Sequence, residues 1–410
     1  MSNIQNKVEN SKVLSPKKKH LNKQEALLAY LKEHYEFRYN IIRNRYEVKA
    51  VGEDQWKEIN ENALWSDVNK LHGKTSKDYL LNTIGSSCIS SRCNPLLEWL
   101  ESLPAPNPDA LSPIGLLASK INLSVGGDDS RGFDRLMIVL RKWFVGAIKT
   151  LLDNRYIHKQ AIVFQGKPGI GKTPFAASLL PSGMHEYLKF TSYLDVRSKD
   201  TTLSLTSSWI IILDEIDYFM KTKQNSDNYK AFMTQKWVNE RPPYAKVPVS
   251  IQRVCVFFGT CNESTFLNDP TGTQRFSVFS IESFAPDIKE FMKEHIVDCW
   301  AEAYHLYKNG FNPEYTKEEL ADNEEKNEEY KYNSPEFETI LQYLAPAKKG
   351  EDNAVFLTTT SICSQMNAKQ TDIIFNNNSL GRAFVRLDLV RKKETVGNQR
   401  IYGYWIKWIK

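Results

Sequence analysis

The feature that most constrains the fold is a glycine-rich segment that directly follows a short apolar run, Gln160–Gln165. This segment reads Gly166-Lys167-Pro168-Gly169-Ile170-Gly171-Lys172-Thr173. When G-x-x-x-x-G-K-[ST] lies between a strand and a helix, its backbone N–H groups turn toward phosphate oxygens and the helix N-terminus adds a positive dipole. Apolar strands separated by helices indicate an α/β core with a parallel sheet. We therefore expect a phosphate-binding loop in such a core.

The residues of this loop have separate expected roles in binding ATP. Lys172 should reach the β- and γ-phosphates, and the Thr173 hydroxyl should ligate Mg²⁺. Pro174 falls in the first helical turn, where its missing N–H costs little. The expected nucleotide-binding residues are Gly166, Lys167, Pro168, Gly169, Ile170, Gly171, Lys172, Thr173 and Pro174. The alternative is a chance match in a glycine-rich turn, but the flanking strand and helix favour a nucleotide site.

A second apolar run, Trp209–Leu213, ends in two adjacent carboxylates. Asp214 and Glu215 follow it, 42 residues after Lys172 (214 − 172). Successive strand residues point in different directions, so the two carboxylates can have different roles. We predict that Asp214 holds Mg²⁺ and that Glu215 polarises the attacking water as general base. The plainer alternative is a strand that merely ends in acidic residues.

A third apolar run, Val254–Phe258, leads to Asn262, and a turn beyond it contains Arg275. In P-loop ATPases with an extra strand between the two earlier motifs, such an amide orients the water near the γ-phosphate. Asn262 is the predicted sensor of this kind. An arginine delivered from a turn to a neighbouring subunit's nucleotide would stabilise charge in the transition state, which is the role predicted for Arg275. A local cap or ion pair is the alternative role for Arg275.

These motifs, in this order, resemble the virulence-associated protein E family. The segments that carry the resemblance are the strand and glycine-rich loop, then IIILDE (210–215), FFGTCN (257–262) and DPTGTQRF (269–276). Members of that family are P-loop ATPases of phages, plasmids and genomic islands, similar to superfamily III helicases. The resemblance is most specific over about 160–281. It implies an AAA+-like fold and a homo-oligomeric ring, usually a hexamer.

The chain departs from the family pattern in the turn that contains Arg275. The family's Arg-Arg-Phe is Gln274-Arg275-Phe276 here, so Arg275 is the only finger candidate in that turn. The family's Arg-x-Pro-Tyr element is Arg241-Pro242-Pro243-Tyr244. Arg241 is therefore a second candidate for the arginine that acts in trans, and the sequence leaves the choice open.

Two regions carry candidate contacts to DNA. Between Asp217 and Val254, cations alternate with aromatic residues, and the corresponding region of superfamily III relatives carries a hairpin that lines the channel of the ring. This composition suits single-stranded DNA, although a solvated lysine-rich loop is the alternative. The candidates here are Lys236, Arg241 and Lys246.

The second such region is the C-terminal part. Predicted helices at Thr358–Met366 and Ser379–Arg386 precede two strands that flank a turn at 396–398, which describes a winged-helix domain. Winged helices also bind proteins, so DNA binding is one of two roles left open. The candidate DNA contacts are Arg382 and Arg386 on the recognition helix and Arg391, Lys392 and Lys393 on the wing.

A chain of 410 residues exceeds what one hydrophobic core usually supports, so several domains are expected. A proline-rich stretch near residue 108 and an acidic run after residue 313 suggest the boundaries. For the N-terminal module, which is α/β or helical, the candidate roles are ring assembly, origin binding and contact with a primase or another replication protein. The predicted divisions are a basic tail (1–22), that module (23–108), an ATPase core (109–312), an acidic linker (313–335) and a winged-helix-like domain (336–410).

Composition excludes several classes of protein. The net charge of +5 is mild for this length, and no apolar run approaches the ~18 residues that a membrane span needs. The first twenty residues lack an apolar segment, so no secretory signal is expected. None of the six cysteines forms a C-x-x-C pair or a zinc-type spacing. We therefore expect a cytoplasmic protein with reduced thiols and no membrane partner.

The leading hypothesis is an ATP-dependent DNA helicase or another replication-associated ATPase of a mobile element, moving along single-stranded DNA in a ring channel. One alternative is an ATP-driven remodeller or loader that acts on a protein partner. Another is a DNA-binding regulator whose ATPase controls oligomerisation. A small-molecule P-loop kinase is disfavoured, because the chain shows no lid with an arginine pattern beyond Thr173.

Overall fold

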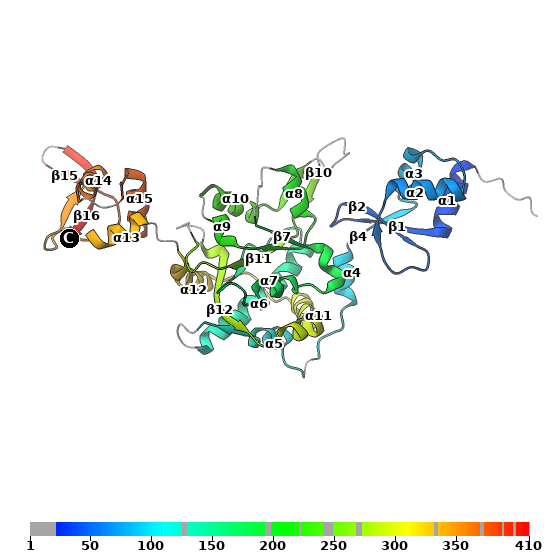
Figure 1. The fold of residues 1–410 in the computed structure, drawn as a ribbon, viewed down its shortest axis with the longest axis horizontal. Coiled ribbons are helices and arrows are strands. Elements are labelled where there is room, and N and C mark those ends of the chain that lie inside the picture. Colours follow the sequence, from blue (N-terminus) through cyan, green and yellow to red (C-terminus); the bar gives the residue numbers. More distant parts are fainter. Residues whose placement is uncertain are drawn as a thin grey trace, which may run out of the picture. The chain divides into compact units, whose positions relative to one another are not determined.

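The computed structural model divides the chain into two compact units, Met1–Leu96 and Leu97–Lys410 (Figure 1). The first unit therefore ends twelve residues before the predicted boundary at residue 108 (108 − 96). The structure describes residues 22–107, 109–124, 129–192, 198–220, 223–240, 249–267, 273–331, 335–369, 373–387, 389–396 and 399–409. The predicted basic tail lies almost entirely outside the described residues.

The first unit is a small α/β module in which three helices pack on a four-stranded sheet. Its elements are α1 (Lys23–His34), β1 (Tyr35–Asn40), β2 (Arg45–Ala50), β3 (Lys57–Glu58), α2 (Glu61–Leu71), α3 (Lys77–Ile84) and β4 (Ser90–Cys93). The strand order is β3-β2-β1-β4, with β1 antiparallel to β2 and parallel to β4. Alternate strand residues such as Phe37 join helix residues such as Leu31 and Val68 in the core. The hairpin turns at Asn44, which has a positive φ of 52°.

The second unit is built on a six-stranded sheet in the order β5-β12-β6-β11-β8-β7. The five strands from β12 to β7 run parallel, and β5 is antiparallel at the edge. Every residue of β8 and β11 is buried, as expected for a parallel sheet covered on both faces. The strands are β5 (Ile121–Leu123), β6 (Ala161–Gln165), β7 (Leu188–Thr191), β8 (Ile210–Leu213), β11 (Val256–Cys261) and β12 (Phe276–Phe284).

The three apolar runs in the sequence thus become β6, β8 and β11, which confirms these strand predictions. The strand β11 lies between β6 and β8 and pairs in parallel with both. The carboxyl ends of these three strands therefore lie next to one another, at one edge of the sheet. The sequence motifs that follow them are brought together there.

Helices α6 and α11 pack against each other beside this sheet. A buried tryptophan on each helix is hydrogen-bonded to the rest of the core. Trp143 Nε1 of α6 donates to the Phe257 carbonyl of β11, and Trp300 Nε1 of α11 donates to the Leu179 carbonyl. The helices of this part are α4 (Pro95–Ser102), α5 (Pro113–Ser119), α6 (Asp129–Leu152), α7 (Lys172–Ala177), α8 (Lys199–Thr206), α9 (Ile216–Met220), α10 (Lys223–Thr234), α11 (Ile288–Lys308) and α12 (Lys317–Asn327). Shorter elements are η1 (Ser182–Tyr187), η2 (Thr273–Arg275), η3 (Glu328–Tyr330) and the antiparallel pair β9 (Trp237–Glu240) and β10 (Val249–Gln252).

The acidic segment predicted to be a linker is instead part of the core, a correction to the sequence prediction. It forms α12, whose N-terminus carries a capping box between Thr316 and Glu319. The helix buries Asn323 and Asn327 against β12, and Asn323 Nδ2 donates to the Phe276 carbonyl at 2.8 Å. The acidic side chains of the exposed face conceal this buried polar face in the sequence pattern.

The C-terminal part of the second unit has a core of its own, which includes Ile340, Ile362, Phe384 and Ile406. The long strand β16 pairs antiparallel with β15 and, further along, with β13 and β14. The two predicted helices and the strand pair are present, while α13, β13 and β14 were not predicted. The predicted turn residues Gly397 and Asn398 lie outside the described residues. The elements are α13 (Pro335–Tyr343), β13 (Leu344–Pro346), β14 (Val355–Leu357), α14 (Thr359–Ala368), α15 (Asn377–Arg386), β15 (Lys392–Val396) and β16 (Gln399–Trp408).

The structure bears on two features expected from composition, reduced thiols and the lack of a membrane span. All six cysteines are free thiols. Within the described ranges, no helix has both the length and the apolar character needed to cross a bilayer.

Candidate functional site

The glycine-rich loop connects the end of β6 to the start of α7. Gly169 and Gly171 have φ angles of +82° and +102°, in the left-handed region where a side chain would be strained. Gly166 is required for space, because a Cβ there would lie 2.5 Å from the backbone oxygen of Ile281 on β12. Two of the motif's glycines therefore serve backbone conformation, and one serves close packing.

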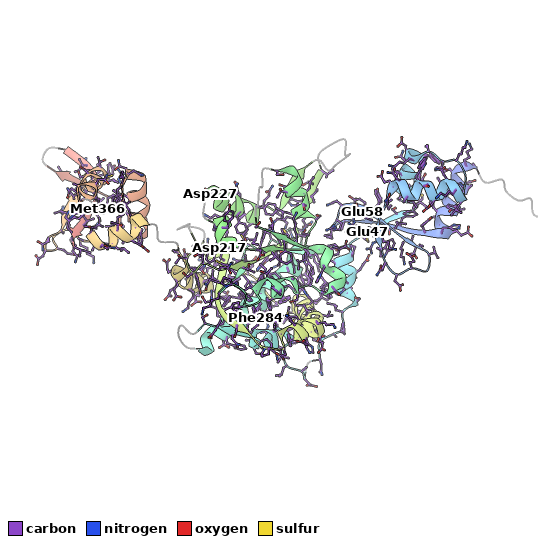
Figure 2. All side chains as sticks on the ribbon, viewed as in Figure 1. Glu47, Glu58, Asp217, Asp227, Phe284 and Met366 are labelled. Atoms are coloured by element: carbon purple, nitrogen blue, oxygen red, sulfur yellow. The ribbon has the colours of Figure 1, made fainter. Side chains whose placement is uncertain are left out.

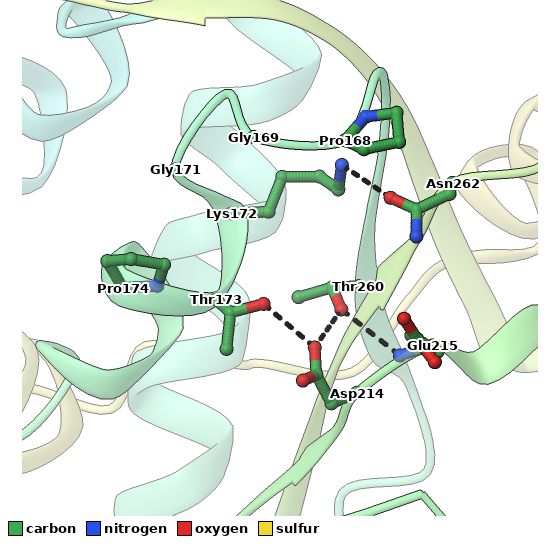
Figure 3. A pocket seen from close by; sticks show the side chains of 10 residues that line it. All are labelled: Pro168, Gly169, Gly171, Lys172, Thr173, Pro174, Asp214, Glu215, Thr260 and Asn262. Carbon is green, nitrogen blue, oxygen red and sulfur yellow. Dashed lines mark hydrogen bonds between the residues drawn. The ribbon is translucent and has the colours of Figure 1, made fainter.

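Lys172 is nearly buried at the mouth of this loop, with 6% of its surface exposed. Its Nζ donates to the carbonyls of Gly166 at 2.6 Å and Lys167 at 2.8 Å, and to Asn262 Oδ1 at 3.0 Å (Figure 3). Burial lowers the pKa of Lys172, against the opposing effects of the nearby Cys261, Asp217 and Asp214. Two residues that were predicted from separate motifs are thus in direct contact.

The Asp214 carboxylate at the end of β8 faces two hydroxyl groups. Its Oδ1 accepts a hydrogen bond from Thr173 Oγ1 at 2.9 Å and another from Thr260 Oγ1 at 2.6 Å. A carboxylate and a hydroxyl that converge in this way present the hard oxygen ligands that Mg²⁺ prefers. The side chains of Thr173 and Asp214 therefore fit the magnesium site predicted for them.

Thr260 is a functional-site residue that the sequence reasoning missed. It lies on β11 two residues before Asn262, and its Oγ1 also accepts a hydrogen bond from the Glu215 backbone N–H at 3.3 Å. The register that pairs Gly259 with Leu213 places Thr260 beside Asp214. A hydroxyl residue near the end of an otherwise apolar strand was the available signal.

Glu215 follows Asp214 in an unusual backbone conformation. Its φ of 55° lies in the left-handed region, which costs a non-glycine residue about 1–3 kcal/mol. This sharp turn sends consecutive carboxylates in different directions, Asp214 toward Thr173 and Glu215 toward the open cavity. The Glu215 carboxylate is exposed and accepts no hydrogen bond from the described residues, so water can reach it.

These residues line a single cavity of about 290 Å³. Asp217, which is labelled in Figure 2, does not line the cavity. It is buried, with 8% exposed, and its Oδ1 has no hydrogen-bond partner in the described structure. The cavity is lined by Pro168, Gly169, Gly171, Lys172, Thr173, Pro174, Asp214, Glu215, Thr260 and Asn262. The structure thus brings together most of the predicted catalytic, nucleotide-binding and metal-binding residues. Gly166, Lys167, Ile170 and Arg275 are those that do not line this cavity.

The comparison with protein-family models matches residues 132–332 to the virulence-associated protein E-like domain. Residues 132–332 are therefore a virulence-associated protein E-like domain. The matched residues include the whole cavity and α12, and they confirm the resemblance drawn from the motifs. The match also contains residues 313–332 of the acidic segment, in agreement with the place of α12 in the core.

Two solved structures are similar to this chain. An apo structure of the NrS-1 C-terminal region is 13% identical, covers 92% of this chain and 98% of that chain, and has a TM-score of 0.53. An A-form apo structure of the same region has the same identity and coverage and a TM-score of 0.48. The first likeness shows a shared fold. No curated protein matches the chain.

Arg275 lies away from the cavity, at the opposite end of the sheet. It directly precedes β12, whose first residue Phe276 pairs with Ala161 at the start of β6. The glycine-rich loop follows the other end of β6, about 13 Å away at roughly 3.3 Å per residue. Arg275 therefore does not reach its own chain's cavity.

A second cavity, of about 420 Å³, has Arg275 in its wall together with Arg155, Lys159 and Tyr315. The Arg275 guanidinium makes no hydrogen bond or ion pair with any described residue. The alternative role of a local cap or ion pair therefore has no support in the described structure.

The DNA-contact candidates between Asp217 and Val254 receive little support. The Nζ of Lys236 is enclosed and has no hydrogen-bond partner among the described residues, and burial lowers its pKa. The Nζ is covered in this conformation, although the residue is half-buried, so the prediction for Lys236 stays a prediction. Arg241 and Lys246 lie outside the described residues. Arg253, another cation of this region, is fully buried and donates to the carbonyls of Met233, Gln235 and Cys255.

The candidates on the C-terminal strand pair are accessible. Arg391, Lys392 and Lys393 are all exposed, and the charged groups of Arg391 and Lys393 lie over the half-exposed Tyr402 ring, at 5.1 and 5.4 Å from its centroid. For Arg382 and Arg386 the structure describes the α15 backbone and not the side chains. The wing prediction therefore agrees with the exposure of its residues, and the recognition-helix prediction stays a prediction.

Proposed function

We propose that this chain is an ATP-dependent DNA helicase or translocase that takes part in replication of a phage, plasmid or genomic island. The observation that carries the proposal is the convergence of Lys172, Thr173, Asp214 and Glu215 on one cavity at the carboxyl edge of the sheet. Ligands of open α/β sheets bind at this edge. The virulence-associated protein E-like domain supports a role in a mobile element, and ATP is the substrate that a loop of this type would bind.

The fold supports an AAA+-like P-loop core. The strand that carries Asn262 lies between the strand that leads to the glycine-rich loop and the strand that ends at Asp214. This is the arrangement expected of P-loop ATPases with an extra strand between their two motifs. In the proposed core, the loop N–H groups and Lys172 bind the phosphates of ATP.

In the proposed reaction, Thr173 and Asp214 hold Mg²⁺, which when bound would neutralise charge on the phosphate oxygens. Glu215 accepts the proton of the attacking water, since its carboxylate is exposed and without a hydrogen-bond partner in the described chain. Asn262 contacts Lys172 at 3.0 Å and is placed to orient that water beside the terminal phosphate. Thr260 holds both Asp214 and the backbone of Glu215, which keeps the two carboxylates in fixed relative positions.

We also propose that hydrolysis takes place at subunit interfaces of a homo-oligomeric ring, a hexamer by resemblance. The support is the position of Arg275, which is about 13 Å from its own cavity by strand length and has no partner in the described chain. A guanidinium placed in this way can serve a nucleotide bound by the next subunit. Arg241 stays the alternative trans arginine, since it lies outside the described residues.

For DNA, we propose a single strand in the ring channel and a winged-helix-like C-terminal domain that assists binding. The support is the exposed group Arg391, Lys392 and Lys393, of which Arg391 directly precedes β15 and the other two are its first residues, with the charged groups of Arg391 and Lys393 over the Tyr402 ring. Cations beside an aromatic ring suit the phosphates and bases of nucleic acid. A primase or another replication protein stays the proposed partner of the N-terminal module.

The deciding experiment measures ATP turnover with and without single-stranded DNA at fixed low salt. The Glu215→Gln variant should lower turnover at least about a hundredfold while nucleotide affinity changes less than about twofold, because only the general base is lost. Glu263→Gln is the matched control, since this exposed glutamate lies next to the cavity residue Asn262 without lining the cavity. Strong stimulation by DNA that Glu215→Gln removes would support a DNA motor.

Two outcomes would count against parts of this proposal. Hydrolysis that is indifferent to DNA would favour the remodeller or loader that acts on a protein partner. Wild-type turnover in a folded Lys172→Ala variant would refute the assignment of the cavity itself.

A further inference from the structure

The backbone on both sides of Arg275 is held by two buried asparagines of α12. Asn327 Nδ2 donates to the Thr273 carbonyl at 2.8 Å and to the Phe276 carbonyl at 2.7 Å. Asn323 Nδ2 donates to the Phe276 carbonyl at 2.8 Å and, at 3.4 Å, to that of Gln274. The two amides thus bind three carbonyls that flank Arg275, and neither of them contacts its guanidinium.

These asparagines are themselves held in place. Asn327 is fully buried and Asn323 is 2% exposed. Arg135 donates to Asn323 Oδ1 at 2.8 Å and to the Val278 carbonyl of β12 at 3.1 Å, so it connects the helix to the strand that follows Arg275. At the N-terminal end of α12, Lys142 binds the Glu319 carboxylate. The helix is therefore fixed on the core at two points.

The chemistry of this contact is more specific than packing requires. Carbonyls in an irregular turn must find donors when they are buried, and an amide N–H₂ group can supply two. Apolar side chains could cover the turn but would leave these carbonyls unpaired, at a cost of about 1–3 kcal/mol each. Four directed hydrogen bonds instead define the path of the backbone from Thr273 to Phe276. The direction in which Arg275 leaves the core follows from that path.

We propose that Asn323 and Asn327 are positioning residues for Arg275, which they hold in the orientation needed to reach a nucleotide bound by the neighbouring subunit. This inference rests on the proposed trans role of Arg275. It gives α12, the segment predicted to be a linker, a part in hydrolysis without any contact to the nucleotide. The prediction is that variants of these two asparagines behave like an Arg275 variant: they lose turnover, and they recover it next to a subunit with an intact Arg275.

The first test is the kinetics of Asn327→Leu, which keeps a similar shape and removes both N–H donors. Turnover should fall about a hundredfold, the loss expected when a reacting group is misplaced by about 1 Å, and the KM for ATP should change less than about twofold. Lys326→Ala, on the exposed face of the same helix, is the matched control and should retain wild-type turnover. Asn323→Ser, which creates less steric change, is the second variant if Asn327→Leu does not fold. Unchanged turnover in a folded variant would overturn the proposal.

Subunit mixing separates positioning from a general structural defect. A Lys172→Ala subunit cannot use ATP but carries a correctly held Arg275. An Asn327→Leu subunit has an intact cavity, so it should recover turnover when a neighbouring Lys172→Ala subunit supplies the arginine. In an equal mixture, about a quarter of the interfaces of a closed ring combine the cavity of an Asn327→Leu subunit with the Arg275 of a Lys172→Ala subunit. About a quarter of wild-type turnover should therefore return. Arg275→Ala mixed with Lys172→Ala is the reference pair and should recover similarly.

The outcomes of this mixing experiment are distinguishable. If the reference pair recovers and the Asn327→Leu pair does not, the positioning role is wrong and the proposed function stands. If the reference pair also fails, Arg275 does not act in trans, and the inference fails together with that part of the proposed function. Recovery in both mixtures supports the proposal.

Discussion

A single added methyl group at Gly166 should disable the candidate nucleotide site. The Cβ of Gly166→Ala would lie 2.5 Å from the backbone oxygen of Ile281 and 2.8 Å from the Ile170 Cδ1 atom. The Ile170 contact can be relieved, because it involves the end of a flexible side chain. The Ile281 contact cannot, because β12 is paired with β6 on one side and with β5 on the other.

The required movement follows from these distances. Ordinary contact begins at 3.4 Å, so the start of the loop must move by about 0.9 Å (3.4 − 2.5). Overpacking of this kind costs about 1–3 kcal/mol of stability, which a core of this size tolerates. A displacement of about 1 Å at a reacting site costs about a hundredfold in turnover, and the Gly166 carbonyl moves together with the Lys172 ammonium that it holds at 2.6 Å.

The assay compares ATP turnover, nucleotide affinity and thermal unfolding for Gly166→Ala, Gly183→Ala and the wild type. A Cβ at Gly183 would meet nothing within 4 Å, so this control should be neutral in all three measurements. We expect Gly166→Ala to remain folded with weakened nucleotide binding and about hundredfold lower turnover. Turnover within about twofold of wild type would refute the close-packing argument, as would an equal loss in Gly183→Ala.

Three further predictions concern the stability of the second unit. Gly146→Ala should destabilise it by about 2–3 kcal/mol or prevent folding, because a Cβ would lie 2.3 Å from Nδ1 of the buried His158 ring; chemical denaturation measures this, and an unchanged midpoint would contradict it. Arg253→Met should cost about 3–5 kcal/mol, because it leaves the carbonyls of a fully buried guanidinium site unpaired, and a loss below about 1 kcal/mol in the same assay would show that they find other donors. Burial lowers the pKa of His158 to about 3, so in acid the unfolded chain binds this proton before the folded one does. Stability should therefore fall as the pH drops below about 6.5 toward 3, by about 2 kcal/mol between pH 6.5 and 5, and a folded His158→Gln variant with the same pH dependence would exclude this histidine as the cause.

The sequence predictions succeeded where the residues that define a feature lie close together in the chain. The loop at 166–173 is contiguous, its glycines are required by backbone angles, and it adjoins an apolar run long enough for a strand. The carboxylates and the amide were found because each ends a buried strand. Thr260 was missed although it lies two residues from Asn262, because its role depends on the register between β11 and β8.

Cations that look alike in the sequence differ in burial, because distant segments of the chain cover some of them and not others. Lys236 was a predicted DNA contact and Arg253 is another cation of the same region, and the structure encloses the charged group of each. Arg391 and Lys393, in contrast, are exposed as predicted. Charge in a sequence indicates which residues prefer water, but burial is decided by segments that pack on top of them.

The sequence alone determined the parallel α/β core, the glycine-rich loop and the order of the candidate site motifs along three strands, because each depends on residues close together in the chain. Only the tertiary structure decided that the acidic segment belongs to the core and that Asn323 and Asn327 hold the turn of Arg275, across 48 and 52 residues (323 − 275 and 327 − 275). It also showed that Arg275 lies at the opposite end of the sheet from its own chain's cavity. The physical reason is that hydrogen bonds and packing between distant segments leave no periodic pattern in either segment, so they become visible only when the sheet brings those segments together.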